Sequence, residues 1–174
     1  MNDAFDTMMA SLDTPMAVVT TAMGDERAGC LIGFQAQSGI EPRRYCVWLS
    51  KANHTYRVAL RSRFLGVHFL TEHDGDVAEH FGTLTGDQVD KFAGTSVSPG
   101  QEGVPLLDAC PNRMVVRRIA LLDEGGDHVC LTTEVVSAET SGPFRPLRLS
   151  AVDHLVPGHE TEDRPLPPTE RSPA

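Results

Sequence analysis

The sequence predicts a mainly β domain, a small antiparallel barrel with short peripheral helices. About six segments are rich in β-branched and apolar residues, and the turn residues between most of them suit hairpins. The helix-like segments are short and do not alternate with the strands, as they would in a doubly wound parallel sheet. Closing the sheet into a barrel also removes exposed edges that would otherwise promote aggregation.

The strands are expected where runs of Val, Ile, Leu and Thr dominate. They span residues 16–22, 27–36, 44–50, 64–70, 113–122 and 128–136, with a further short strand at 146–152. Gly29 and Gly33 lie inside the second strand, which indicates a bulge or a place where a ligand approaches the backbone. The connector from Asp123 to Asp127 contains two glycines and predicts a hairpin.

Helical patterns flank or connect these strands at residues 4–11, 53–63 and 74–81. Asn53 is a suitable N-cap for the second helix, because its side chain can accept a hydrogen bond from a free backbone N–H. Gly82 follows the third helix and suits its C-terminal end. These helices are too short to form a layer of their own.

Length and composition indicate one ordinary soluble domain. The chain has 174 residues, 40% of them hydrophobic and 22% charged. We expect residues 1–156 to form the domain and residues 157–174 a Pro-rich C-terminal tail, which has too few apolar residues to offset its ordering entropy. No run approaches the roughly 20 apolar residues of a membrane span, and the first residues lack the pattern of a signal peptide. A cytoplasmic protein without a membrane partner is therefore expected.

The same composition argues against nucleic acids and metals as ligands. A net charge of -9 is unsuited to contacts with a phosphate backbone. The four cysteines are far apart and form no C-x-x-C pair, and the seven histidines show no ligand spacing. We therefore expect buried reduced thiols and no metal site.

One window of the chain is basic although the protein is acidic. Between Pro42 and Thr71 there is no Asp or Glu, and six cations occur: Arg43, Arg44, Lys51, Arg57, Arg61 and Arg63. Local positive charge attracts an anionic ligand that the rest of an acidic protein repels. The segment from Ser50 to Thr55 joins a strand to a helix inside this window and is a candidate phosphate cradle. The alternative is a plain capped helix with a solvated basic face.

Eight short motifs in one order carry a family resemblance. They are Thr14-Pro15 with Val18-Val19-Thr20-Thr21, Gly29 with Gly33 to Ser38 and Pro42, Ser50-Lys51-x-x-x-Thr55, Phe64-x-Gly66-Val67, Phe81-Gly82, Asp90-Lys91-Phe92, Gly103-x-Pro105-Leu106, and Gly126-Asp127-His128. The series resembles the flavin reductase-like family of FMN-binding split barrels over about residues 5–150. The resemblance implies a six-stranded Greek-key split barrel, a homodimer with the flavin near the subunit interface, and reduction of the flavin by NADH or NADPH.

The resemblance also implies roles for individual residues. The segment lining the isoalloxazine ring corresponds to Gly33, Phe34, Gln35, Ala36, Gln37 and Ser38. The phosphate-binding stretch corresponds to Ser50, Lys51, Asn53 and Thr55. Positions near the cofactor or the dimer correspond to Phe81, Gly82 and Lys91, for which core packing, with Lys91 in solvent, is the alternative. His128 corresponds to the histidine that faces the flavin and the nicotinamide, and it is the candidate catalytic residue.

Two departures from the family pattern leave other functions open. Thr133 stands where relatives usually have glycine, and residues 148–154 replace a stretch that often contains an aromatic residue. The resemblance implies an NAD(P)H-dependent flavin reductase that uses FMN, or else FAD, and supplies reduced flavin to a monooxygenase. The alternatives are a split-barrel protein that uses a deazaflavin or haem, since fold does not dictate chemistry, and a non-catalytic module that binds flavin or an acidic partner.

Overall fold

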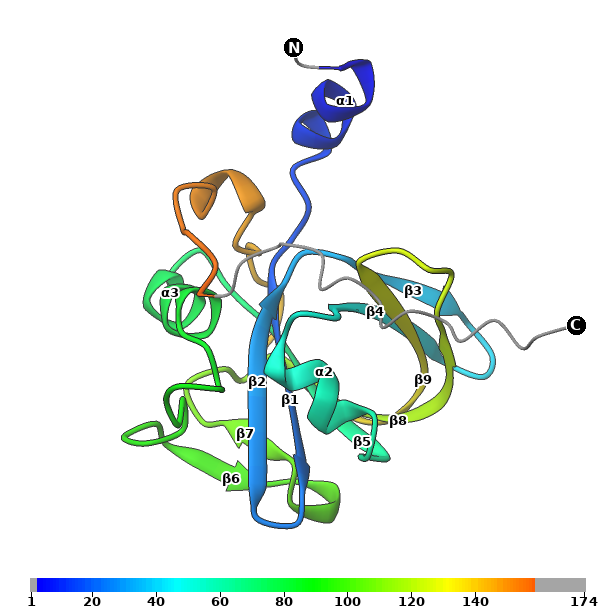
Figure 1. Cartoon of the computed structure of the whole chain (residues 1–174), viewed down its shortest axis with the longest axis vertical. Coiled ribbons are helices and arrows are strands. Elements are labelled where there is room, and N and C mark those ends of the chain that lie inside the picture. The colour runs from blue at the N-terminus through cyan, green and yellow to red at the C-terminus, as the bar shows by residue number, and fades with distance from the viewer. Residues whose placement is uncertain (1–2, 159–174) are drawn as a thin grey trace, which may run out of the picture.

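An antiparallel sheet of seven strands curls around the main core (Figure 1). The computed structural model describes residues 3–158. In chain order the strands of this sheet are β1 (Ala17–Met23), β2 (Glu26–Ile32), β3 (Gln35–Gly39), β4 (Arg44–Ser50), β5 (Phe64–Phe69), β8 (Arg113–Leu122) and β9 (His128–Glu139). In space they follow the order β2-β1-β5-β8-β9-β4-β3. The short strands β6 (Val97–Pro99) and β7 (Pro105–Leu107) form a separate pair.

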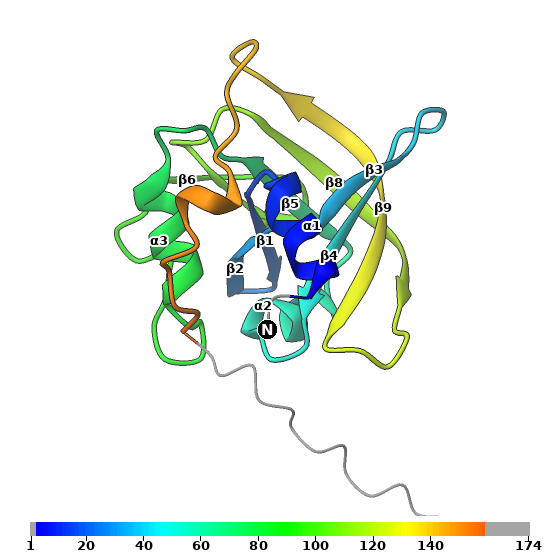
Figure 2. The same ribbon diagram turned by 90° about the horizontal axis from the view of Figure 1, so that it is seen from above.

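The prediction of six strands was wrong in number, because the second predicted strand is divided. β2 ends at Ile32 and β3 begins at Gln35, so Gly33 and Phe34 form the break between them. These two strands lie at opposite ends of the sheet. The chain therefore passes from one end of the sheet to the other within two residues, which requires the strong curl seen from above in Figure 2.

The residues 146–152 do not form the further strand that the sequence predicted. Pro146 and Arg148 make only isolated bridges, to Thr71 and Pro15 respectively, and Leu149–Ala151 is a turn of 3-10 helix. Their backbone pairs with segments far away in the chain rather than with a neighbouring strand. A local sequence pattern carries no information about such distant pairing.

The interior of the curl is apolar because alternate residues of each strand point inward. Its fully buried side chains include Val19, Val47, Leu49, Leu65 and Leu131. Each such side chain contributes about 1.5–3 kcal/mol by leaving water. Because Val47, Leu49 and Leu131 point into this core, the residues that alternate with them along β4 and β9 point outward.

The helices are short and partly cover the sheet. They are α1 (Ala4–Leu12), α2 (His54–Ala59) and α3 (Gly75–Thr83). The second is shorter than predicted, because Ser62 Oγ donates to the carbonyls of Ala22 and Val58 and turns the chain toward β5. None of the helices in the described part of the chain is long and apolar enough to cross a membrane.

A second core lies between the sheet and α3. Phe81 of α3 packs edge-on against Phe92, with the ring centroids 5.6 Å apart. A Cβ atom at Gly29 of β2 would lie only 2.9 Å from the Phe81 ring. The glycine inside this strand therefore permits close packing of an aromatic side chain, and the pairing of β1 with β2 runs past it without a bulge.

His68 of β5 joins this second core to β7. Its Nδ1 lies 3.1 Å from the carbonyl oxygen of Val18, and the backbone N–H of Leu107 donates to its Nε2 at 3.0 Å. The ring is therefore neutral, with its proton on Nδ1. Burial lowers the pKa of His68 from 6.5 to about 4.

This buried histidine predicts loss of stability in mild acid. Between pH 6.5 and about 4 the unfolded chain binds a proton that the folded chain does not, so stability falls as pH falls. The loss from this group is about 3 kcal/mol. Urea unfolding at several pH values across this range gives the free energy of unfolding as a function of pH. This free energy should fall less steeply toward acid for His68→Gln than for the wild type, whereas His73→Gln, at an exposed histidine, should behave as the wild type. The same pH dependence in all three proteins would contradict the prediction.

Candidate functional site

The predicted ring and phosphate segments meet at one end of β3, β4 and β9. Ser50, the last residue of β4, pairs with His128, the first residue of β9. The backbone N–H of Lys51 donates to the carbonyl oxygen of Asp127 at 2.9 Å. The turn that follows β4 is thereby joined to the loop between β8 and β9. Residues more than 70 positions apart in the chain thus share one surface.

Phe34 completes this surface from the break between β2 and β3. Its ring lies 5.1 Å from the ring of His128, at an interplanar angle of 66°. The Nδ1 atom of His128 is 3.0 Å from the carboxylate of Asp127, which restrains the imidazole. The Phe34 ring remains largely exposed. An exposed aromatic ring beside a restrained histidine is a suitable place for a flat ligand.

The free edge of β3 supplies backbone donors next to this surface. Phe34 accepts a hydrogen bond from Trp48 N–H on β4 at 3.0 Å, so alternation directs the N–H groups of Gln35 and Gln37 away from β4. β3 is the last strand of the sheet, and its outer edge has no strand partner among residues 3–158. Hydrogen-bond donors are therefore available at this edge.

The side chains of β3 contribute less than its backbone. The Gln35 amide donates to the Pro15 carbonyl at 3.0 Å and accepts from the Tyr45 hydroxyl at 3.2 Å. Gln37 donates to the carbonyl of Gly39 within its own turn. Ala36 offers no polar side-chain atom, and Ser38 is exposed. The ring segment thus combines one anchored glutamine with exposed backbone.

Most backbone N–H groups of the expected phosphate cradle already donate hydrogen bonds to acceptors within the same turn. The N–H of Ala52 donates to Ser50 Oγ at 3.3 Å, the N–H of Asn53 donates to the Ser50 carbonyl at 3.0 Å, and the N–H of Thr55 donates to Asn53 Oδ1 at 3.0 Å. Asn53 is thus the predicted N-cap. Thr55 is buried. The N–H groups of Ala52, Asn53 and Thr55 therefore already have partners within this turn, and phosphate binding by Lys51 and its neighbours stays a prediction.

The basic window is neutralised in the fold by carboxylates from outside it. Five of its six cations form ion pairs: Arg44 with Glu134, Lys51 with Asp123, Arg57 with Asp87, Arg61 with Glu26, and Arg63 with Glu102. The expectation of an isolated positive field was therefore wrong. Pairs of this exposed kind contribute about 0–1 kcal/mol each to stability.

The pair between Lys51 and Asp123 lies within the candidate site. Lys51 Nζ donates to Asp123 Oδ1 at 2.7 Å, and the N–H of Gly125 donates to the same oxygen at 2.9 Å. The lysine and the Gly125 N–H together hold the pKa of Asp123 below its ordinary value. A carboxylate thus occupies the position beside Lys51 that an anionic ligand would take. Nothing in the local sequence pattern identified this residue.

The family model described as flavin reductase like domain matches residues 9–150. The chain belongs to this family. No curated protein matches the chain significantly.

Solved structures share the fold. The NADH:FAD oxidoreductase of Streptomyces globisporus C-1027 is 22% identical, with a TM-score of 0.69 over 83% of this chain and 93% of that chain. An FMN-binding protein from Thermus thermophilus with bound p-hydroxybenzaldehyde is 22% identical, with a TM-score of 0.69 over 74% and 73%. A Sinorhizobium meliloti 1021 protein is 21% identical, with a TM-score of 0.72 over 85% of this chain, and the chain spans 51% of that protein.

Three other residues expected near the cofactor of this flavin reductase-like domain lie in the second core. Phe81 is buried, and a Cβ atom at Gly82 would lie 2.9 Å from Leu31 of β2. Lys91 is only 5% exposed, and its ammonium donates to the carbonyls of Gly29 at 2.9 Å and Phe81 at 3.1 Å. The alternative of a solvent-exposed Lys91 was therefore wrong. Burial lowers the pKa of this lysine, and a direct contact with cofactor stays a prediction.

Thr133, the departure from the family pattern, also points inward. It is fully buried, and its hydroxyl donates to the carbonyl of Tyr45 at 2.8 Å. The second departure, residues 148–154, contains the 3-10 turn Leu149–Ala151. Thr133 therefore belongs to the interior of the sheet and not to a ligand entrance.

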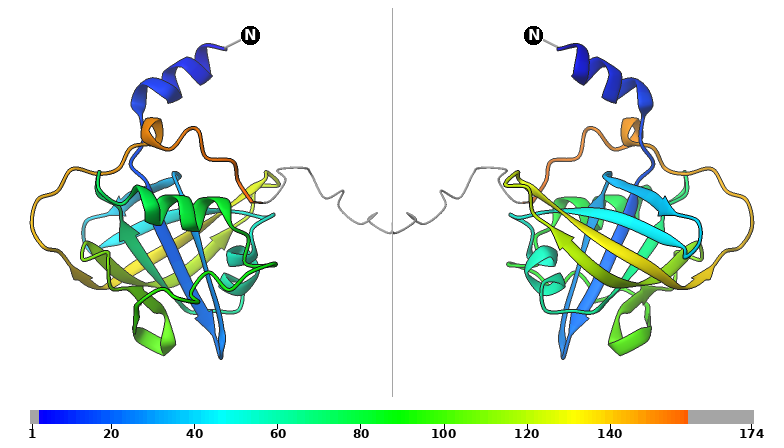
Figure 3. Two further views of the ribbon diagram at one scale, coloured as in Figure 1. Left: turned by 90° about the vertical axis from the view of Figure 1, so that its left-hand side faces the viewer. Right: turned by 90° about the vertical axis from the view of Figure 1, so that its right-hand side faces the viewer.

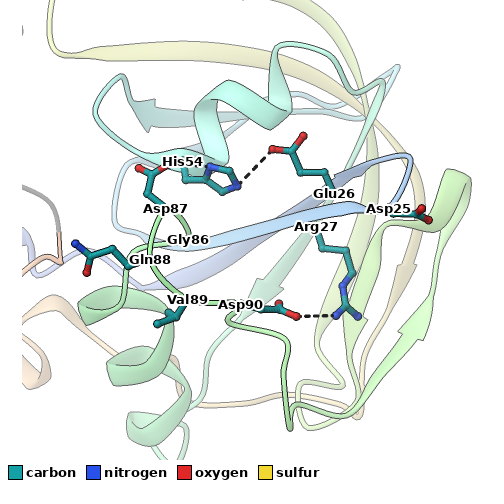
Figure 4. A pocket seen from close by; sticks show the side chains of 9 residues that line it. All are labelled: Asp25, Glu26, Arg27, His54, Gly86, Asp87, Gln88, Val89 and Asp90. Atoms are coloured by element: carbon teal, nitrogen blue, oxygen red, sulfur yellow. Dashed lines mark hydrogen bonds and ion pairs between the residues drawn. The ribbon is translucent and has the colours of Figure 1, made fainter.

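An open hollow beside α2 gathers residues that the sequence had not singled out (Figure 4). His54 lies between two carboxylates, with Nε2 3.6 Å from Glu26 and Nδ1 3.3 Å from Asp87. Both acids also pair with arginines of the basic window. No group of three or more metal-binding side chains occurs within residues 3–158.

The contacts of Lys91 predict a structural role that can be measured. Lys91→Met removes both donors and leaves two buried carbonyls unpaired, so we expect a loss of about 2 kcal/mol in the free energy of unfolding. Lys51→Met, which breaks only an exposed pair, should cost less than about 1 kcal/mol. Urea denaturation of the two variants would compare them, and an unchanged stability of Lys91→Met would refute the role.

Proposed function

We propose that the chain is a flavin-binding oxidoreductase that transfers hydride from NADH or NADPH to FMN, with FAD as the alternative flavin. Membership of the flavin reductase-like family supports the general reaction. The single observation that carries the proposal is the meeting of Phe34, His128, the free edge of β3 and Lys51 on one surface. A flavin nucleotide needs a flat contact, hydrogen-bond donors and a cation, and this surface offers all three.

Each part of the surface has a role in the proposed reaction. The outward N–H groups of β3 donate to the polar edge of the isoalloxazine and stabilise the charge that accumulates there on reduction. A flavin held there would supply the redox chemistry, by taking up the hydride of the nicotinamide nucleotide and passing its electrons to a second substrate. The Lys51 ammonium and the Ser50 hydroxyl bind the phosphate. Asp127 restrains His128, which positions the nicotinamide beside the flavin, because hydride transfer needs a separation of about 3–3.5 Å.

The finer parts of the proposal rest on the family resemblance. They are a homodimer with the flavin near the interface, a split barrel of Greek-key topology, a cytoplasmic location, and delivery of reduced flavin to a monooxygenase. The relatives named above support the choice of cofactors, since one is an NADH:FAD oxidoreductase and another is an FMN-binding protein. An absorption spectrum of the purified protein with its native ligand would reveal a deazaflavin or a haem instead.

Hydride transfer is tested by mixing the FMN-loaded protein anaerobically with NADH or NADPH in a stopped-flow instrument. We expect bleaching of the flavin band with at least one nucleotide. His128→Ala should slow bleaching roughly 10- to 100-fold, the effect of a misplaced reactant, with little change in FMN affinity. Binding of FMN without bleaching by either nucleotide would defeat the reductase and leave a flavin-binding module.

The ion pair at Lys51 predicts a phosphate-specific gain in affinity. Asp123→Asn frees the ammonium and removes a carboxylate that repels phosphate, so FMN should bind about two- to fivefold more tightly, which corresponds to about 0.4–1 kcal/mol and lies within the range of an exposed pair. Lys51→Met should weaken FMN binding. Riboflavin, which has no phosphate, is the matched ligand control in fluorescence-quenching titrations. Equal effects on riboflavin and FMN would place the phosphate elsewhere.

A further inference from the structure

Trp48 of β4 points out of the sheet next to the candidate site. Its neighbours Val47 and Leu49 fill the main core, and successive residues of a strand point to opposite faces. Trp48 therefore lies on the same face as Ser50, about 7 Å from it along the strand. The right-hand view of Figure 3 looks onto the side of the molecule where β3 and β4 (light blue to cyan) and β9 (yellow) are neighbours. An indole ring thus adjoins the proposed phosphate turn.

Phe34 lies opposite Trp48. The backbone N–H of Trp48 donates to the carbonyl oxygen of Phe34 at 3.0 Å, and the register of β3 and β4 places the two residues across from each other. Side chains in such positions have Cβ atoms about 4.5–5.5 Å apart. The Phe34 ring also reaches His128 of β9, on the other side of β4, with ring centroids 5.1 Å apart. Three rings from three neighbouring strands therefore lie at one end of the sheet.

The remaining neighbours of the indole are small. Along β4 the adjacent residues on its face are Cys46 and Ser50, and across the sheet Trp48 pairs with Cys130 of β9. Of these four nearest positions, only that of Phe34 carries a bulky side chain. Both thiols are buried, whereas Trp48 is partly exposed. Small side chains around a large ring leave room beside it for a flat ligand.

The indole N–H of Trp48 is a free donor. It has no acceptor within residues 3–158, and it is not buried, because the buried unpaired side-chain groups of these residues are on Arg44 and Thr55. Indole N–H groups that are buried usually have a hydrogen-bond partner. Trp48 therefore offers a ligand both an aromatic face and a donor. A flavin ring, which is flat and carries carbonyl oxygens, can use both.

Trp48 is also the electron-rich ring of this face. The chain has one tryptophan and two tyrosines, Tyr45 and Tyr56, and both tyrosines pack against the main core. Phenyl and imidazole rings, such as those of Phe34 and His128, are weaker electron donors than an indole. A flavin in contact with Trp48 would therefore have a spectroscopic signature that the other rings of this face do not produce.

We propose that Trp48 binds the isoalloxazine ring, so that the flavin lies along β4 with its phosphate at Ser50 and Lys51. The inference rests on the proposed function and adds a residue to its site. It divides the site into two parts, because Trp48 contacts the ring and Lys51 contacts the phosphate. A ligand that has the ring should depend on Trp48 whether or not it carries a phosphate.

The first test measures the dissociation constants of riboflavin and FMN by isothermal titration calorimetry. Trp48→Leu should weaken the binding of both ligands about 10-fold, the size of a lost aromatic contact. Lys51→Met should weaken FMN binding alone. Phe144→Leu is the control and should change neither constant, since Phe144 is a 38% exposed aromatic residue beyond the opposite end of β9. Unchanged constants for Trp48→Leu would overturn the proposal.

The second test uses the fluorescence of the bound flavin. An indole in contact with an excited flavin donates an electron, which then returns without emission of light, so the wild type should bind a dark flavin. Trp48→Phe keeps a flat ring and should bind riboflavin within about threefold of the wild type, yet its bound flavin should emit several times more strongly. Because Phe preserves a ring at this position, this variant also decides the matter if Trp48→Leu fails to fold. A bright flavin on the wild type, or a dark one on Trp48→Phe, would overturn the proposal.

Anaerobic addition of NADH or NADPH to the same complexes separates this inference from the proposed function. Flavin bound with unchanged affinity and emission by both Trp48 variants would overturn the role of Trp48 and leave the oxidoreductase intact. A dark flavin whose affinity depends on Trp48, but which neither nucleotide bleaches, would support the role and defeat the reductase. A wild-type protein that binds neither riboflavin nor FMN would defeat both proposals.

Discussion

The connection through Gly33 and Phe34 is the constraint on which the rest of the architecture depends. β2 and β3 lie at opposite ends of the sheet, yet the chain from Ile32 to Gln35 spans at most about 11 Å. The sheet must therefore curl until its end strands come close together. This curl creates an interior for the apolar side chains and leaves β3 with a free edge. It also places Phe34 beside His128, at the junction where the candidate site lies.

The electrostatics of the site result from the same curl. Along the chain the basic window contains no carboxylate, but in space five of its cations are paired with carboxylates from outside it. An anionic ligand therefore does not enter an open positive field. At the proposed phosphate site an anionic ligand would have to displace Asp123 from Lys51, at the cost of that exposed pair. Affinity for a phosphate there would then be an exchange between two anions.

Polar and apolar surfaces adjoin at the candidate site. The adjoining ends of β4 and β9 offer Ser50, Lys51 and His128, while Phe34 offers an exposed apolar ring beside them. A flavin nucleotide has a flat ring and an anionic tail, so it needs both kinds of surface together. Lys91, by contrast, stabilises the core behind β2 through two carbonyls.

The sequence by itself determined the local elements. β-branched runs located β8 at Arg113–Leu122, Asn53 marked the start of α2, and the motif order led to a family that comparison confirmed. These signals depend on neighbours within a few positions, where side-chain direction and capping act. Only the tertiary structure decided the break at Gly33, the burial of Lys91 and the partner of Lys51. Each of these depends on groups far apart in the chain, such as Lys51 and Asp123, and local patterns carry no information about which distant surfaces meet.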